Sequence, residues 1–230
     1  SFGFGHLPIR AVYLLYCSAL RAENCDSIPL SSASYNTHTN FVMREFTLIH
    51  GCMFAGKTTQ LIGLYNESMC STEEKLAVKP LLDKRYNATT INTHSGIQML
   101  AHRISKAEEI YPLINEMTKE VYIDEVQFFG PFIIEVIGEL MMNQIKVVAA
   151  GLDKDYMARD FGPMASLKKL ATQKIEVKAI CHICHKPANH TYRKPGNDDL
   201  LLVGHTDIYE ARCEAHWLEG MKDRIEPISQ

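Results

Sequence analysis

The stretch HGCMFAGKTTQLI, residues 50–62, sets two glycines five positions apart and follows the second with a lysine and a threonine. Gly51 to Thr58 therefore fit the pattern G-x-x-x-x-G-K-[ST]. Glycines in this pattern allow backbone conformations in which several N–H groups converge on phosphate oxygens. The lysine can reach the terminal phosphates of a nucleotide, and the hydroxyl can ligate Mg²⁺. The alternative is a chance turn that carries a surface lysine.

The residues on either side of this motif favour phosphate binding. EFTLIH, residues 45–50, predicts a strand that ends at Gly51. TTQLIGLYNESM, residues 58–69, repeats apolar residues with the period of a helix. Strand, glycine-rich loop and helix in this order are the context that such a loop requires, and the helix adds the positive end of its dipole. We therefore expect the whole phosphate-binding loop to contact a nucleotide, through Gly51, Cys52, Met53, Phe54, Ala55, Gly56, Lys57 and Thr58.

The chain after this loop alternates between apolar strand patterns and helical patterns. Strands are predicted at 75–80, 120–125 and 144–151, and helices at 105–117 and 131–143. The first of these helices begins with the capping-box pair Ser105 and Glu108, and the second has Pro131 in its first turn. Alternating strands and helices predict an α/β fold with a mainly parallel sheet, in which ligands bind beyond the carboxyl ends of the strands.

A pair of carboxylates ends one predicted strand. VYIDEVQFF, residues 121–129, places Asp124 where a carboxylate can hold Mg²⁺. Glu125 points differently if the strand pleat persists, and it could take a proton from an attacking hydroxyl or activate water, as in an ATPase. A solvated acidic turn is the simpler alternative. The two phenylalanines that follow favour a small organic acceptor, because they can exclude water and pack against a ring.

Cysteines cluster near the C-terminus in two chelating pairs. CHIC at 181–184 and CEAH at 213–216 suit a tetrahedral zinc site of three thiolates and one imidazole. A closed ligand set of this kind indicates a structural metal. The predicted ligands are Cys181, Cys184, Cys213 and His216, with His182 and His185 as rival ligands, and two buried cysteines beside an unrelated histidine as the alternative without metal.

Composition narrows the class of protein. The chain has 230 residues, 46% of them hydrophobic, with 24 basic and 27 acidic side chains. This balance lacks the basic excess of a nucleic-acid-binding surface, and no apolar run is long enough to span a membrane. The 7 cysteines are odd in number and scattered, which argues against a secreted disulfide framework and for a reducing, cytoplasmic location.

The domain boundaries follow changes in composition. Residues 1–42 are expected to be a leader or extension without chemistry, although AVYLLYCSAL at 11–20 could pass for a signal-peptide core. Residues 43–177 are expected to form the nucleotide-binding kinase domain and 178–217 a small zinc-binding β lobe, with 218–230 as a tail.

Taken together, GCMFAGKT, IDEVQFF, GLDKDYMARDFGP and the split cysteine pairs resemble the cytosolic-type (type II) thymidine kinases. The resemblance runs from about Met43 to His216. It implies a RecA-like domain with a zinc-tethered lobe whose lasso segment closes over the nucleoside, assembled as a homotetramer. It also implies transfer of the γ-phosphate of ATP to the 5′-hydroxyl of thymidine or deoxyuridine, in pyrimidine deoxynucleotide salvage.

The resemblance assigns roles to individual residues. Glu125 would be the general base on the 5′-hydroxyl, and Thr58 and Asp124 would hold magnesium. Besides the phosphate-binding loop, the ATP site would include Asp83, Lys84, Arg85, Asp124, Glu125, Val126 and Gln127. Tyr156 would pack on the thymine ring. The rest of the nucleoside site would comprise Met53, Phe128, Leu152, Phe161, Thr191 and Tyr209, with Leu200, Leu201, Leu202, Val203 and Gly204 as the lasso segment that reads the base through its backbone.

Three positions depart from the family pattern. Cys52 stands where proline is common, His216 replaces a cysteine ligand, and His205 replaces a second glycine of the lasso. Two other functions remain open from the residues alone. One is an ATPase that binds nucleic acid through a zinc ribbon, and the other is a zinc-stabilised nucleotide sensor without catalysis.

Overall fold

The strand in front of the phosphate-binding loop lies inside a six-stranded sheet. The computed structural model describes residues 44–81, 90–92, 98–194 and 208–225. The strand order is β5-β2-β6-β7-β1-β8, and every pairing in this sheet is parallel. The strands are β1 (Phe46–Gly51), β2 (Lys75–Pro80), β5 (His102–Ile104), β6 (Glu120–Ile123), β7 (Lys146–Leu152) and β8 (Gln173–Glu176). The predicted α/β class with a mainly parallel sheet is confirmed.

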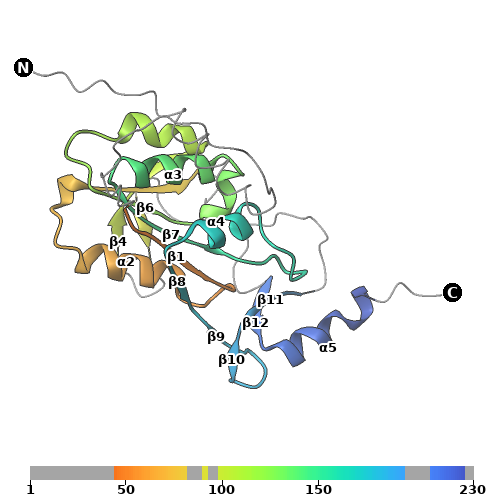
Figure 1. Cartoon of the computed structure of the whole chain (residues 1–230). Helices are drawn as coiled ribbons and strands as arrows, with labels where there is room; N and C mark the ends of the chain where they lie inside the picture. The colour runs from red at the N-terminus through yellow and green to blue at the C-terminus, as the bar shows by residue number, and fades with distance from the viewer. Residues whose placement is uncertain (1–43, 82–89, 93–97, 195–207, 226–230) are drawn as a thin grey trace, which may run out of the picture.

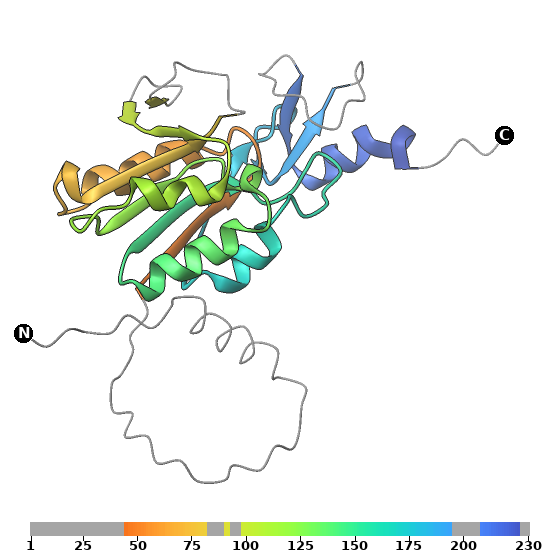
Figure 2. The same ribbon diagram turned by 90° about the horizontal axis from the view of Figure 1, so that it is seen from above.

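Helical segments cover both faces of the sheet (Figures 1 and 2). Leu48 and Ile49 are adjacent in β1 and fully buried, but they belong to different hydrophobic clusters. This follows from the alternation of side chains along a strand. Ile49 shares its cluster with Leu61 and Ile62 of α2 (Lys57–Glu67). Leu48 shares the other cluster with side chains of α3 (Ile133–Met142), α4 (Met164–Leu170) and the 3₁₀ segment η3 (Ala107–Leu113).

The prediction of an α-helix at 105–117 is wrong. The segment forms only the 3₁₀ helix η3, which has Pro112 inside it. Proline lacks the N–H that an α-helix needs at this point, and its ring clashes with the preceding turn. The capping pair differs as well, because Glu109 and not Glu108 accepts hydrogen bonds from the backbone N–H groups of Ser105 and Lys106.

Two strands of the main sheet, β5 and β8, were not predicted. Both are short, and the burial pattern of β8 is largely exposed. The sequence QKIE of β8 has a single apolar residue, so period-2 patterning could not reveal it. The two strands form at the edges of the sheet because their backbone groups pair with those of β1 and β2, β8 with β1 and β5 with β2. Short elements elsewhere are the 3₁₀ segments η2 (Thr72–Glu74) and η4 (Val126–Phe129) and the antiparallel pair β3 (Thr90–Asn92) and β4 (Gln98–Leu100).

A set of small strands and one helix follows the main sheet and lies to one side of it (Figure 1). The antiparallel pairs are β9 with β10 and β11 with β12. These elements are β9 (Ala179–Ile180), β10 (Pro187–Ala188), β11 (His190–Arg193), β12 (Tyr209–Arg212) and α5 (Glu214–Ile225). The expected lasso, residues 200–204, lies outside the described part of the chain.

None of the helices in the described part of the chain combines the length and the apolar character needed to cross a bilayer.

Gly51 provides a test of the junction between the main sheet and the small lobe. A Cβ atom at Gly51 would lie 2.1 Å from the carbonyl oxygen of Val177. We therefore expect Gly51→Ala to lower the free energy of unfolding by about 2 kcal/mol or more, measured by urea denaturation. Gly63, in α2, has open space around its Cβ position. Gly63→Ala should raise the same free energy by about 0.5–1 kcal/mol through helix propensity. Equal effects of the two substitutions would contradict this account.

Candidate functional site

The phosphate-binding loop connects β1 to α2 at the carboxyl end of the sheet. Gly56 has φ 81 and forms the N-cap of α2, and no side chain caps this helix start. The first N–H groups of α2 are therefore placed to bind an anion, with the helix dipole in the favourable direction. Phe54 also has a positive φ, 63, within the loop. Backbone of this shape is suited to N–H groups that converge on phosphate oxygens.

The Lys57 side chain is buried against the backbone of the phosphate-binding loop. Its ammonium donates a hydrogen bond to the carbonyl oxygen of Cys52 at 2.7 Å. Burial lowers the pKa of Lys57, and the negative charges of Glu125 and Asp124 act in the opposite direction. The Lys57 ammonium therefore interacts electrostatically with the two carboxylates that follow β6, although 66 or more residues separate them in sequence from the loop.

Asp124 faces the hydroxyl of Thr58. The Thr58 hydroxyl donates to the carboxylate, with distances of 3.4 Å to Oδ1 and 3.3 Å to Oδ2. The backbone N–H of Glu125 donates to Asp124 Oδ1 at 3.0 Å, which fixes the carboxylate near the strand end. A hydroxyl and a carboxylate form a pair of oxygen ligands of the kind that Mg²⁺ takes from nucleotide-binding proteins.

Glu125 is oriented by a backbone turn, and the explanation by strand alternation is wrong. β6 ends at Ile123, and Glu125 has φ 49 and ψ 44, in the left-handed region. A residue other than glycine seldom takes this conformation, which costs of order 1–3 kcal/mol and concentrates at functional sites. The turn sends the Glu125 side chain in a direction that the period of the strand did not predict.

Gln127 holds the Glu125 carboxylate. Its side-chain Nε2 donates to Glu125 Oε2 at 2.6 Å, and its Oε1 accepts from the backbone N–H of Leu152 at 3.1 Å. Gln127 is itself only 3% exposed, so the amide has little freedom to leave this arrangement. A single side chain therefore links the carboxylate after β6 to the end of β7. Val126, between the two, is fully buried in the core.

Phe128 belongs to the turn that follows Glu125, and its backbone N–H donates to the Glu125 carbonyl oxygen at 3.1 Å. Phe128 and Phe161 pack edge to face, with ring centroids 5.5 Å apart. Thr191 of β11 accepts a hydrogen bond through Oγ1 from the backbone N–H of Met53 at 3.1 Å. The phosphate-binding loop and the small lobe thus touch directly, through two residues predicted to lie at the nucleoside.

Arg193 lies near two of the predicted site residues, which the sequence did not reveal. It is fully buried, and its guanidinium carbon lies 5.2 Å from the ring centroid of Tyr156 and 6.0 Å from that of Tyr209. Cations at such distances are attracted to ring faces. The two tyrosines come from the loop after β7 and from β12, so Arg193 brings together residues that the sequence places far apart. The strand HTYR gives no sequence signal that marks Arg193 as a buried cation.

A cluster of charged side chains that the sequence did not reveal includes His50, the residue before the phosphate-binding loop. Lys168 Nζ is 2.9 Å and His50 Nδ1 is 3.5 Å from Asp153 Oδ2. Burial by itself would raise the pKa of Asp153, but the neighbouring His50 and Lys168 hold it well below its ordinary value. The charged Asp153 thereby connects the strand before the loop, α4 and the loop after β7.

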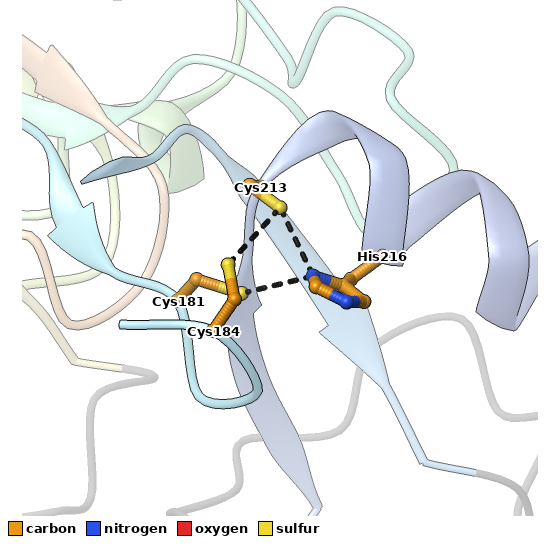
Figure 3. Close-up of side chains that lie close together, drawn as sticks. All are labelled: Cys181, Cys184, Cys213 and His216. Atoms are coloured by element: carbon orange, nitrogen blue, oxygen red, sulfur yellow. Dashed lines mark hydrogen bonds between the residues drawn. The ribbon is translucent and has the colours of Figure 1, made fainter. Parts of the chain in front are cut away.

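The four predicted zinc ligands come together (Figure 3). Their ligand atoms all lie within 4.8 Å of one another. His216 Nδ1 is 3.2 Å from Cys213 Sγ and 3.7 Å from Cys181 Sγ, and Cys184 Sγ is 3.7 Å from Cys213 Sγ. Three sulfurs and one imidazole fit tetrahedral zinc, and the set leaves no position for a substrate.

Two thiols of this cluster, those of Cys181 and Cys213, have lowered pKa values, whereas the pKa values of Cys184 and His216 are raised. Although burial raises it, hydrogen bonds from backbone groups of Cys184 and Cys213 lower the pKa of Cys181 to about 5. A thiolate is the form that binds metal. The rival ligands point elsewhere: the His182 side chain is 68% exposed and lies 3.8 Å from Glu210, and His185 is exposed in a left-handed turn.

Several predicted site residues lie outside the described part of the chain. They are Asp83, Lys84 and Arg85 of the expected ATP site and Leu200, Leu201, Leu202, Val203 and Gly204 of the expected lasso.

Comparisons with known proteins agree with one another. The family model described as "Thymidine kinase" matches residues 44–217. Among curated relatives, a thymidine kinase of Bdellovibrio bacteriovorus is 36% identical over 184 residues, which cover 76% of this chain and 90% of that protein. A thymidine kinase of Coprothermobacter proteolyticus is 37% identical, covering 74% and 88%, and one of Mycoplasma mobile is 35% identical, covering 78% and 90%.

The metal cluster leads to a test that does not depend on activity. The purified protein should contain about one zinc per chain, measured by elemental analysis. Cys213→Ser removes one ligand of the cluster and should reduce the bound zinc strongly, with a lower midpoint of thermal unfolding. Cys70→Ser is the matched control, because Cys70 is a free cysteine outside the cluster. Full zinc content in the Cys213 variant would refute the ligand set.

Proposed function

Because the chain belongs to the thymidine kinase family, we propose that its catalytic centre lies between the phosphate-binding loop and Glu125. The chain is an ATP-dependent kinase, and the reaction of its family transfers the γ-phosphate of ATP to the 5′-hydroxyl of thymidine. The observation that carries the proposal is the contact between the Thr58 hydroxyl of the phosphate-binding loop and the Asp124 carboxylate after β6, which also accepts a hydrogen bond from the backbone N–H of Glu125.

Glu125 is the general base in this proposal. Its carboxylate takes the proton of the 5′-hydroxyl as the oxygen attacks the γ-phosphorus. The Gln127 amide donates to Glu125 Oε2 at 2.6 Å, which restrains the orientation of the carboxylate. Lys57 lies near enough to influence Glu125 electrostatically, and its ammonium offsets negative charge on the transferring phosphoryl group.

The donor side of the centre binds ATP. Residues 51–58 contact the phosphates, and the segments 83–85 and 124–127 complete the ATP site. Thr58 and Asp124 would hold Mg²⁺, which supplies charge neutralisation at the phosphates when it is bound. Their side chains already face each other at 3.3–3.4 Å.

The acceptor side binds thymidine, and deoxyuridine as a second substrate. Tyr156 packs on the base, while Phe128 and Phe161 limit the access of water. Met53, Leu152, Thr191 and Tyr209 form the remaining wall, and residues 200–204 read the base through their backbone. Arg193 supports this wall from behind, since it lies against both Tyr156 and Tyr209.

The remaining assignments concern the assembly and location of the protein. Cys181, Cys184, Cys213 and His216 hold a structural Zn²⁺, and residues 178–217 act as the lobe that covers the nucleoside. The enzyme is a cytoplasmic homotetramer with no nucleic-acid partner, an assignment that the resemblance to the type II enzymes supports. Light scattering should then give a mass near that of four 26.0-kDa chains, and a clearly smaller mass would remove the tetramer.

Purified protein with Mg-ATP and a panel of deoxynucleosides tests the proposed function. Phosphate transfer to thymidine and to deoxyuridine, with little transfer to purine deoxynucleosides, is the expected result. ATP hydrolysis that needs DNA and no nucleoside would instead support an ATPase.

Glu125→Gln tests the role of the base. The substitution keeps the size of the side chain and removes the proton acceptor, so kcat should fall by about 10²–10⁴-fold while ATP binding persists. Glu73→Gln is the control, because Glu73 lies in η2, is exposed and should leave kcat unchanged. A wild-type kcat in the Glu125 variant would exclude this residue as the base.

A further inference from the structure

Trp217 joins the C-terminal helix to the loop that carries Tyr156. It is the one tryptophan of the chain, lies in α5 and is 7% exposed. Its indole Nε1 donates a hydrogen bond to the backbone carbonyl of Tyr156 at 3.1 Å. The indole also stacks on His190 of β11, with ring centroids 4.9 Å apart and an interplanar angle of 27°. A buried indole with its N–H satisfied in this way has a single stable orientation.

The loop after β7 is compact and rests on this helix. Asp155 accepts hydrogen bonds from the backbone N–H groups of Met157 and Arg159 and pairs with the Arg159 guanidinium. These bonds close the loop on itself but do not connect it to the rest of the protein. Met157 and Ala158 pack against the cluster of Tyr192, Trp217 and Met221, which provides that connection. The position of the Tyr156 backbone is thus set by α5 as well as by β7.

The start of α5 is tied to the metal cluster. Cys213 precedes the helix and His216 lies in its first turn. The backbone N–H of Trp217 donates to the carbonyl oxygen of Cys213 at 2.9 Å. The indole is therefore one residue from a predicted metal ligand, so the same helical turn presents an imidazole to the metal cluster and an indole to the loop.

We propose that Trp217 is a positioning residue for nucleoside binding, which transmits the anchoring of α5 at the metal cluster to the loop that carries Tyr156. This inference rests on the proposed function, since it takes Tyr156 as the residue that packs on the base. Trp217 does not touch the substrate. It holds the main chain of Tyr156 in place, while Arg193 faces the Tyr156 ring.

Trp217→Phe isolates the indole hydrogen bond. Phenylalanine keeps an aromatic ring against His190 and the apolar cluster but cannot donate to the Tyr156 carbonyl. We expect the KM for thymidine to rise about 2- to 10-fold, the scale of one hydrogen bond, with the KM for ATP and the zinc content unchanged. Leu218→Ala is the matched control, because Leu218 is the next residue of α5 and is 49% exposed. It should alter none of these quantities.

A second readout uses the indole itself. Thymidine binding should change the fluorescence emission of the wild-type protein, because its one tryptophan bonds to the loop that closes on the base, whereas ATP alone should leave the emission unchanged. A role in stability alone would lower the urea midpoint of the Phe variant but leave its KM for thymidine unchanged, and the emission of the wild-type protein would then show no selective response to thymidine.

The outcomes separate the inference from the function on which it rests. An active wild-type enzyme whose Phe variant keeps the wild-type KM for thymidine, or whose emission ignores thymidine, would overturn the inference alone. A wild-type protein that transfers no phosphate to thymidine would overturn the proposed function, and this inference with it.

Discussion

The site depends on the parallel register of β6, β7 and β1. Gly51, the last residue of β1, pairs with Leu152, the last residue of β7. β6 ends earlier, with Ile123 opposite Ala149. The chain after β6 therefore turns beside β7, which continues to Leu152. Gln127 lies in this turn, and its side-chain oxygen accepts a hydrogen bond from the backbone N–H of Leu152. Parallel pairing brings all carboxyl ends to one edge, but this difference in strand length puts Glu125 in place.

Glu125, the proposed general base, occupies a costly backbone conformation. Left-handed geometry at Glu125 disfavours the folded state by of order 1–3 kcal/mol. The surroundings maintain it: Asp124 accepts from the Glu125 N–H, and Gln127 donates to its side chain. Such an arrangement is pre-organised, so little reorientation of the base is needed when a hydroxyl arrives. The strain is consistent with selection for function over local stability.

Among the residues that the structure describes, the hydrophobic clusters of the small lobe are smaller than those of the main sheet. One of the lobe's clusters consists largely of alanine and cysteine side chains around Cys181, and the other centres on Tyr192, Trp217 and Met221. Clusters this small contribute little burial, so a bound metal would account for much of the lobe's order. The lobe nonetheless supplies Thr191, Arg193 and Tyr209 to the region beside the phosphate-binding loop. The predicted metal ligands and the predicted nucleoside residues Thr191 and Tyr209 thus lie on the same small lobe.

By itself the sequence determined the phosphate-binding loop, the carboxylates after β6 and the metal cluster, because each is a short motif whose chemistry depends on local spacing. It could not identify β5 and β8, whose strands form only where neighbours offer backbone partners. Nor could it place Arg193 against Tyr156 or Trp217 against the Tyr156 carbonyl. Only the tertiary structure decided these contacts, because they join segments distant in sequence and result from packing and from the burial of polar groups that must find partners.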